Sequence, residues 1–151
     1  MSRFAIQRHF ATFQPLLALN QAIQASGLEP KLITLVEMRA SQINGCGYCL
    51  DMHSKDARAA GETEQRLYLL PAWREADCYA ERERAALAWC EALTRLDGHD
   101  SVSDALYEKV SAHFDERELV HLTLLVTAIN SWNRINLAAR TPAGRYKPAA
   151  H

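Results

Sequence analysis

The feature that most constrains this chain is a long apolar run near its carboxyl end, residues 119–129, which reads LVHLTLLVTAI. If the run is helical, apolar side chains lie on nearly every side of the helix, as in helices that protein encloses. Asp115 and Glu118 match the capping-box pattern that opens a helix, which predicts a helix over 115–139. We therefore expect this helix in the core or in a subunit interface.

The rest of the chain also has helical periodicity, and no run of alternating β-branched residues competes with it. Pro15 suits a first helical turn and Gly27 a helix end, and Ser101 with Asp104 resembles another capping box. The other predicted helices cover residues 15–27, 30–44, 46–60, 62–70, 81–96 and 103–113. These patterns predict an all-α fold, a compact helical bundle of about six to seven helices. We expect one domain over residues 1–151, with its core at about 15–140.

Composition excludes several classes of function. Hydrophobic residues make up 48% of the chain and charged residues 23%, an ordinary globular balance, and the net charge is −1. A nearly neutral chain has no electrostatic footprint for nucleic acid or an anionic membrane, so neither is expected as a partner. The first twenty residues contain no unbroken apolar stretch of the kind that a signal peptide has, so we expect a cytoplasmic protein.

The chemistry concentrates in one short segment, residues 44–53, which reads NGCGYCLDMH. On a helix, Cys46, Cys49 and His53 would lie within about a sixth of the circumference, so that three reactive groups share one face. Such a group can be a redox dithiol with its own base, part of a metal site, or two inert thiols beside an imidazole. In a cytosolic chain a CxxC pair at a helix start favours the redox dithiol.

A metal site is the weaker interpretation. Structural zinc takes four ligands, whereas Cys46, Cys49 and His53 supply three, and no second CxxC or HxxxH completes the set. His99, His113 or His121 could add a ligand only through a coincidence of folding. The isolated cysteines, Cys78 and Cys90, are expected to be core thiols, and His121 an interior or interface histidine. We expect no metal and no cofactor.

A redox dithiol needs one thiolate that attacks first. A thiolate can cleave the O–O bond of a peroxide and become a sulfenic acid, which a second thiol converts to a disulfide. The helix dipole favours the thiolate of Cys46, whereas the imidazole one turn away favours that of Cys49. We give the histidine more weight and expect Cys49 to attack first.

The segment LVEMRASQINGCGYCLDMHSKDARAAGE resembles the core of the alkylhydroperoxidase D-like proteins of the carboxymuconolactone decarboxylase superfamily. The later segments ERERAALAWCEALTRL and LTLLVTAINSWNRIN are similar to that family's later helices. The resemblance implies an all-α fold that forms homotrimers or homohexamers through helix packing. It also implies reduction of a hydroperoxide substrate by the CxxC pair, and regeneration by a thiol reductant system, either thioredoxin-like or a lipoyl adaptor.

The resemblance further implies a proton relay from a glutamate through His53 to the thiol. The relay glutamate of the family falls on Thr34, which cannot act as a carboxylate base. Glu37, one turn further along the same predicted helix, could replace it or could simply face solvent. Tyr48 stands between the cysteines where well-studied members carry histidine, and could donate a hydrogen bond to a peroxide oxygen or merely pack.

The leading hypothesis is therefore a thiol peroxidase that acts in antioxidant defence, with Cys46, Cys49 and His53 as its catalytic residues and Glu37 and Tyr48 as candidates beside them. A second hypothesis is a general disulfide oxidoreductase or stress-response dithiol protein with little peroxidase activity. A third is a helical module that binds a small ligand or a metal near inert thiols.

Overall fold

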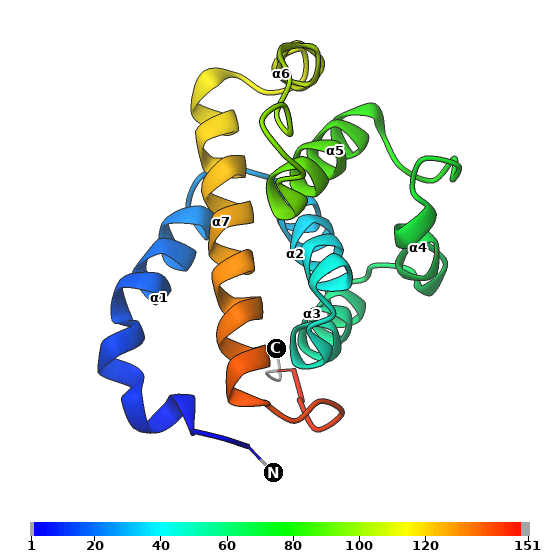
Figure 1. The fold of residues 1–151 in the computed structure, drawn as a ribbon. Helices are drawn as coiled ribbons and strands as arrows, with labels where there is room; N and C mark the ends of the chain where they lie inside the picture. The colour runs from blue at the N-terminus through cyan, green and yellow to red at the C-terminus, as the bar shows by residue number, and fades with distance from the viewer. Residues whose placement is uncertain (1, 149–151) are drawn as a thin grey trace.

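The computed structural model describes residues 2–148, and these residues form helices and connecting segments without a β-strand (Figure 1). The prediction of an all-α fold is confirmed. The elements are η1 (Ile6–His9), α1 (Phe10–Gln24), α2 (Pro30–Asn44), α3 (Gly47–Ala59), α4 (Glu64–Leu69), η2 (Leu70–Ala72), α5 (Glu81–Arg95), α6 (Asp104–Ser111) and α7 (Glu116–Ala139).

Three helices, α2, α5 and α7, form the centre of the bundle and pack against one another (Figure 1). Their shared core includes Val36, Cys90, Leu122 and Val126, each at most 1% exposed. A smaller apolar cluster lies where α2 and α5 meet α3, α4 and η2, and it includes Leu70. Helix α2 therefore contributes to both clusters, which fixes it firmly between the two sides of the molecule.

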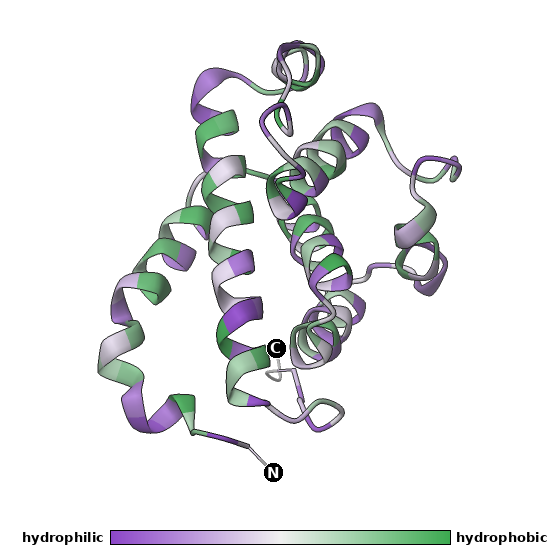
Figure 2. Cartoon of the chain, in the orientation of Figure 1, coloured by the Kyte–Doolittle hydropathy of each residue, from purple (hydrophilic) through white to green (hydrophobic). Residues whose placement is uncertain are grey.

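Helix α7 is enclosed along most of its apolar run, as predicted, but not on every side. Leu122, Leu125 and Val126 are buried, whereas Val120 and Leu124 are exposed. Towards its carboxyl end the helix changes character, because hydrophilic residues replace hydrophobic ones there (Figure 2). Several of these polar residues are buried asparagines, so this half of α7 brings polar groups into the interior.

The structure confirms one of the two predicted capping boxes and corrects the other. The capping box at Asp115 is confirmed, since Asp115 and Glu118 exchange hydrogen bonds of 2.8 and 3.1 Å. Helix α6, however, is capped by Ser103, whose hydroxyl accepts from the backbone N–H of Leu106, and not by Ser101. The hydroxyl of Ser101 donates instead to the carbonyl of Gly98, within the preceding turn.

Helix α1 begins at Phe10 and contains Pro15, so the prediction of Pro15 in the first helical turn is wrong. A proline inside a helix leaves the carbonyl four residues earlier without its usual donor. Here that carbonyl belongs to Ala11, and both Pro15 and Ala11 are exposed, so water can serve as the donor. The sequence pattern alone did not show that this side of the helix faces solvent.

The turn between α2 and α3 sets the position of the cysteines. Gly45 ends α2 with a φ of +68°, a left-handed conformation that glycine adopts without strain. The backbone N–H of Cys46 then donates to the carbonyl of Ser41, and Cys46 becomes the N-cap of α3. As a result, α3 starts beside the last turn of α2, and the two helices pack against each other.

The segment after α7 runs back along α3. Asp51 accepts hydrogen bonds from the backbone N–H groups of Gly144 and Tyr146, and Lys55 donates to the carbonyl of Tyr146. The hydroxyl of Tyr146 donates to the carboxylate of Asp56. The described residues after α7, 141–148, thus form a docked segment that covers one side of α3. In residues 2–148 no helix combines the length and apolarity that a membrane span requires.

Candidate active site

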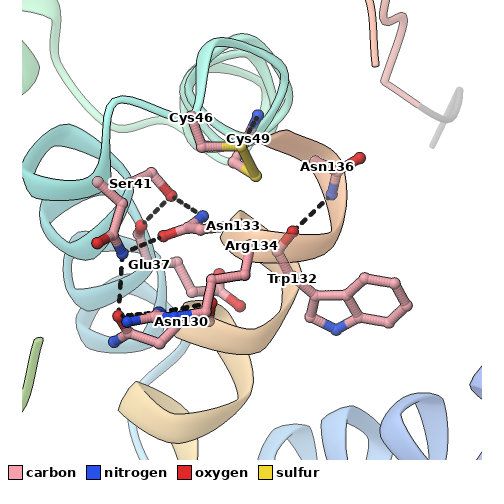
Figure 3. The surroundings of a disulfide bond; sticks show 10 residues. Glu37, Ser41, Cys46, Cys49, Asn130, Trp132, Asn133, Arg134 and Asn136 are labelled. Atoms are coloured by element: carbon pink, nitrogen blue, oxygen red, sulfur yellow. Dashed lines mark hydrogen bonds between the residues drawn. A yellow bond between two sulfur atoms is a disulfide. The ribbon is translucent and has the colours of Figure 1, made fainter. Parts of the chain in front are cut away.

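Cys46 and Cys49 are joined by a disulfide at the start of α3, with their Cα atoms 5.3 Å apart (Figure 3). The Sγ atom of Cys46 accepts from the backbone N–H of Cys49 at 3.4 Å. A sulfur at a helix N-terminus that accepts a backbone N–H is stabilised as a thiolate. Both residues are 1% exposed, so the dithiol is shielded from bulk solvent.

His53 lies on α3 one turn beyond Cys49, and it pairs with a carboxylate from α2. The Nδ1 atom of His53 is 3.2 Å from Oε2 of Glu37, and both side chains are largely buried, with 12% and 17% of their surfaces exposed. Nδ1 is thereby engaged by the carboxylate, which leaves Nε2 as the ring nitrogen that faces other groups. The structure therefore brings Glu37, His53 and the dithiol together.

A cavity of about 300 Å³ opens beside these residues. Cys49, His53, Glu37 and Tyr48 line it, whereas Cys46 does not. Met52 of α3 also lines it, and the remaining wall comes from η1, α1, α7 and the segment after α7, through Ile6, Gln7, Leu17, Asn20, Ile129, Trp132, Asn136 and Thr141. A molecule in this cavity can therefore contact Cys49 and the Glu37–His53 pair, but not Cys46.

Thr34 does not belong to this site. It lines a different cavity, formed with Leu35, Ala57 and Leu67, and its hydroxyl donates to the carbonyl of Pro30 within α2. Of the two positions considered for the carboxylate, the structure thus places Glu37 beside His53 and Thr34 away from it. Tyr48 is half-buried in the wall of the site cavity.

A network of asparagine side chains holds the turn between α2 and α3 that carries the cysteines. The sequence analysis did not predict this network. The side-chain amide of Asn44 donates to Asn130 and Asn133 at 2.9 and 2.8 Å, and Asn133 donates to the hydroxyl of Ser41 at 3.0 Å (Figure 3). These bonds tie the last turn of α2 to α7. The available signal was the pair Asn130 and Asn133, which are three residues apart and so share one face of the helix just after its apolar run.

A buried ion pair between Arg39 of α2 and Glu91 of α5 also holds α2 in place. The carboxylate of Glu91, on α5, accepts from Arg39, Arg74 and the indole N–H of Trp73 at 2.7 to 2.9 Å. Burial acts to raise the pKa of Glu91, but these hydrogen bonds outweigh it and lower the pKa. Glu91 is therefore a buried carboxylate whose charge is compensated, and it holds α2 against α5.

The other cysteines lie apart from the site. Cys90 is fully buried in the main core, and burial raises the pKa of its thiol to about 12. Cys78 is half-buried at the edge of the smaller cluster, so the prediction of a core thiol is correct for Cys90 alone. His121 is half-buried, and its Nδ1 lies 2.8 Å from the carbonyl of Arg117. Within residues 2–148 no three His, Cys, Asp or Glu side chains are arranged as a metal site.

Known proteins share this sequence and this arrangement of helices. The model of the carboxymuconolactone decarboxylase family matches residues 11–92. The uncharacterized protein YdfG of Bacillus subtilis (strain 168) is 50% identical over 104 residues, which are 69% of this chain and 70% of YdfG. The uncharacterized protein YnjA of Escherichia coli (strain K12) is 32% identical over 118 residues, 78% of this chain and 64% of YnjA. The chain thus spans less than two thirds of YnjA.

A solved structure extends the likeness to almost the whole chain. The Agrobacterium tumefaciens protein ATU0492 superposes with a TM-score of 0.90 and 38% identity, over 97% of this chain and 100% of that one. ATU0492 is a protein of unknown function that has been suggested to be the antioxidant defence protein AhpD. The chain therefore belongs to the carboxymuconolactone decarboxylase family and is an alkylhydroperoxidase D-like member of that superfamily.

Proposed function

We propose that this protein is a thiol peroxidase that reduces hydroperoxides through a cycle between the Cys46–Cys49 dithiol and its disulfide. The observation that carries the proposal is the cavity beside Cys49, in whose wall His53 and Glu37 lie 3.2 Å apart. A nucleophile, a base and a group that orients the base are the parts that thiol activation needs. The family membership and the likeness to ATU0492 support the same class of chemistry.

In the first step, Nε2 of His53 takes the proton of the Cys49 thiol while Glu37 holds Nδ1 and stabilises the imidazolium. The Cys49 thiolate attacks the terminal oxygen of the hydroperoxide, an S–O bond forms, and the O–O bond breaks. The alkoxide leaves with the proton that His53 returns. Sulfur loses two electrons, and the hydroperoxide is reduced to the alcohol.

In the second step, Cys46 resolves the sulfenic acid. Its thiolate, stabilised by the N-terminus of α3, attacks the sulfur of Cys49, and the S–S bond forms as the hydroxyl leaves with a proton as water. The product is the disulfide that the structure contains. An external dithiol then exchanges with this disulfide and carries away its own oxidised form. Because both cysteines are 1% exposed, a slender group such as a lipoyl arm suits this step better than a folded partner.

The test is consumption of cumene hydroperoxide by the reduced protein with dithiothreitol as reductant. We expect Cys49→Ser to abolish turnover. We expect the reduced Cys46→Ser variant, after removal of dithiothreitol, to consume one equivalent of hydroperoxide and to stop with a sulfenic acid that dimedone traps at Cys49. Cys78→Ser is the matched control, since it makes the same chemical change outside the site and should keep full turnover.

The same assay separates the peroxidase from a general disulfide oxidoreductase. If the reduced protein loses its thiols to hydroperoxide no faster than free cysteine does, while it exchanges disulfides readily, the peroxidase proposal is wrong. Full turnover in both the Cys46→Ser and the Cys49→Ser variants would also contradict it.

A further inference from the structure

The docked segment, residues 141–148, is held on α3 by two side chains that bind its backbone. The carboxylate of Asp51 accepts from the N–H groups of Gly144 and Tyr146 at 2.8 and 3.2 Å, and Nζ of Lys55 donates to the carbonyl of Tyr146 at 2.9 Å. Asp51 and Lys55 also form an ion pair at 2.7 Å. The hydrogen bond from Lys55, together with those from the two N–H groups, lowers the pKa of Asp51, so Asp51 holds the segment as a carboxylate at neutral pH.

The side chain of Tyr146 is a second anchor for the docked segment. Its hydroxyl donates to the carboxylate of Asp56 at 3.0 Å. Burial raises the pKa of Tyr146, and the hydrogen bond to Asp56 and the charges of Asp56 and Tyr48 raise it further. Tyr48, which directly precedes Cys49, is therefore near Tyr146. The docked segment thus reaches the turn that carries the cysteines.

The docked segment lies against the two residues between the cysteines. A Cβ atom placed on Gly47 would lie 3.5 Å from Cβ of Ala143. Thr141, at the start of the segment, and Tyr48 both line the cavity beside Cys49. The segment therefore runs from the cavity wall past the CxxC turn and along α3 (Figure 1). It occupies surface beside the turn that a protein partner would otherwise contact.

This placement affects small and folded reductants differently. In disulfide exchange the attacking thiolate has to reach a sulfur of the disulfide. Both sulfurs belong to residues that are 1% exposed, and Cys49 is reached through the cavity. A small dithiol can enter the cavity alone. A folded reductant such as thioredoxin has to bring its own surface against the CxxC turn, where the docked segment lies.

The docked segment is attached weakly enough to open. None of the residues 141–148 is buried, and the segment is held mainly by the hydrogen bonds to Asp51, Lys55 and Asp56. Segments with few buried contacts and exposed hydrogen bonds open locally at a small cost in free energy. The anchors at Asp51 and Tyr146 therefore set how often the CxxC turn is uncovered.

We propose that the docked segment selects the reductant of the Cys46–Cys49 disulfide: when closed, it admits small dithiols and obstructs folded proteins. This inference rests on the proposed function, since it concerns the reductive half of the same cycle. In that half, two electrons and two protons pass from the dithiol of the reductant, which becomes a disulfide, to Cys46 and Cys49. Opening of the segment gives a folded reductant access to the same bond.

The test compares two reductants on the oxidised protein, without any hydroperoxide. Dithiothreitol is the small reductant and reduced thioredoxin the folded one. Acid quenching, alkylation of the free thiols and mass spectrometry give the rate at which Cys46 and Cys49 become reduced. Hydrogen exchange at the backbone amide of Gly144, measured by nuclear magnetic resonance, reports release of the segment in the same samples.

Variants at the two anchors should open the segment. Asp51→Ala removes the acceptor of both N–H groups, and Tyr146→Ala removes the bond to Asp56. Each should accelerate exchange at Gly144 and reduction by thioredoxin about tenfold, because lost hydrogen bonds raise the open fraction of the segment. The rate with dithiothreitol should change less than about threefold, because the cavity already admits it.

Matched controls make the same chemical changes at exposed positions outside α3 and the docked segment. Asp97→Ala lies in the loop between α5 and α6, and Tyr107→Ala lies on α6. Both should keep the rates of the unaltered protein. Equal gains with both reductants in the anchor variants would overturn the proposal, as would faster exchange at Gly144 without a gain in the thioredoxin rate. Unchanged exchange in both anchor variants would overturn it too, because these anchors would then not hold the segment.

Peroxidase assays separate this inference from the proposed function. If the anchor variants gain reduction by thioredoxin but the reduced protein consumes no cumene hydroperoxide, the role of the docked segment is supported and the peroxidase proposal is wrong. If cumene hydroperoxide is consumed with dithiothreitol but the anchor variants show no selective gain with thioredoxin, the peroxidase stands and this inference is wrong.

Discussion

Cys49 and Cys90 are almost equally buried, at 1% and 0% exposure, yet their surroundings differ in kind. Cys90 lies in the middle of α5, donates to the carbonyl of Val36 and is surrounded by apolar core residues. Cys49 lies in the first turn of α3, lines a cavity and has His53 one turn away. Burial alone therefore does not decide what a thiol can do; the difference lies in which groups face the sulfur.

The surroundings act on the two thiols in opposite directions. Apolar burial disfavours a charge on Cys90, which raises the pKa of that thiol to about 12. At Cys49, a helix N-terminus and an imidazole that a carboxylate orients both favour a thiolate. A cysteine side chain is thus an inert core residue at position 90 and a candidate nucleophile at position 49.

Thiol modification offers the largest expected contrast. In the reduced protein at pH 8, iodoacetamide should label Cys49 within minutes, whereas Cys90 should react about 1,000-fold more slowly than an ordinary thiol, since its pKa rises from 9.0 to about 12. Labelling of Cys90 should accelerate only when pH rises towards 12 or when the protein unfolds. Mass spectrometry of the peptides measures both rates. Rapid labelling of Cys90 in the folded protein would contradict the difference in reactivity between the two cysteines.

Removal of the base should have the next largest effect. His53→Gln should lower the rate of hydroperoxide reduction about 100-fold, because the general base is lost. Glu37→Gln should lower it about tenfold, because the imidazole is no longer oriented. Turnover of cumene hydroperoxide measures both.

The position of the carboxylate can be tested by moving it. In the Glu37→Gln background, Thr34→Glu restores a glutamate where the family resemblance places one, but on a part of α2 that lines a different cavity. We expect no recovery of turnover in the double variant. Recovery to the level of the unaltered protein would show that the relay runs from position 34.

The asparagine network should matter for stability more than for chemistry. Asn133→Leu leaves the amide of Asn44 and the hydroxyl of Ser41 with fewer partners, and we expect a loss of about 1–3 kcal/mol in the free energy of unfolding. Urea denaturation measures this loss. Arg117→Ala, an exposed change on the same helix and outside the network, is a suitable control and should cost less. Equal losses in the two variants would contradict a special role for the network.

A pH-dependent effect is expected at Glu91, the residue next to Cys90 in the chain. Its pKa in the folded protein is lowered from 4.5, so its contribution to stability is present above pH 4.5 and is lost as pH falls through the lowered value. Glu91→Gln should therefore destabilise the protein near pH 7, and the difference from the unaltered protein should shrink as pH falls below 4.5. Thermal melts across pH 3 to 7 measure it; a difference that is constant with pH would contradict this account.

The sequence allowed the helices and the dithiol to be predicted, because both depend on local patterns. Helical periodicity, Gly45 and the CxxC spacing place Cys46 and Cys49 at a helix start whatever surrounds them. The capping box at Asp115 is similarly local. Pro15 was misassigned because its place inside α1 depends on which side of that helix faces solvent. Ser101 was misassigned because either of two nearby serines could cap α6.

The contacts across the bundle could not be predicted in the same way. Whether Glu37 or Thr34 reaches His53 depends on the rotation of α2 relative to α3, which tertiary packing sets. The partnership of Asn44 with Asn133 and the cavity lined by Trp132 and Asn136 join segments that are far apart in the chain. Such sites arise from packing, and a single sequence contains no periodic signal for them.

The most direct test of the account is the rate at which the reduced Cys46→Ser variant reacts with cumene hydroperoxide at pH 7 in a stopped-flow instrument. In this variant only Cys49 in the site can react, so the rate reports its activation alone. We expect a second-order rate constant far above that of free cysteine, and a fall of about 100-fold when His53→Gln is added. A rate equal to that of free cysteine, or one that His53→Gln leaves unchanged, would contradict it.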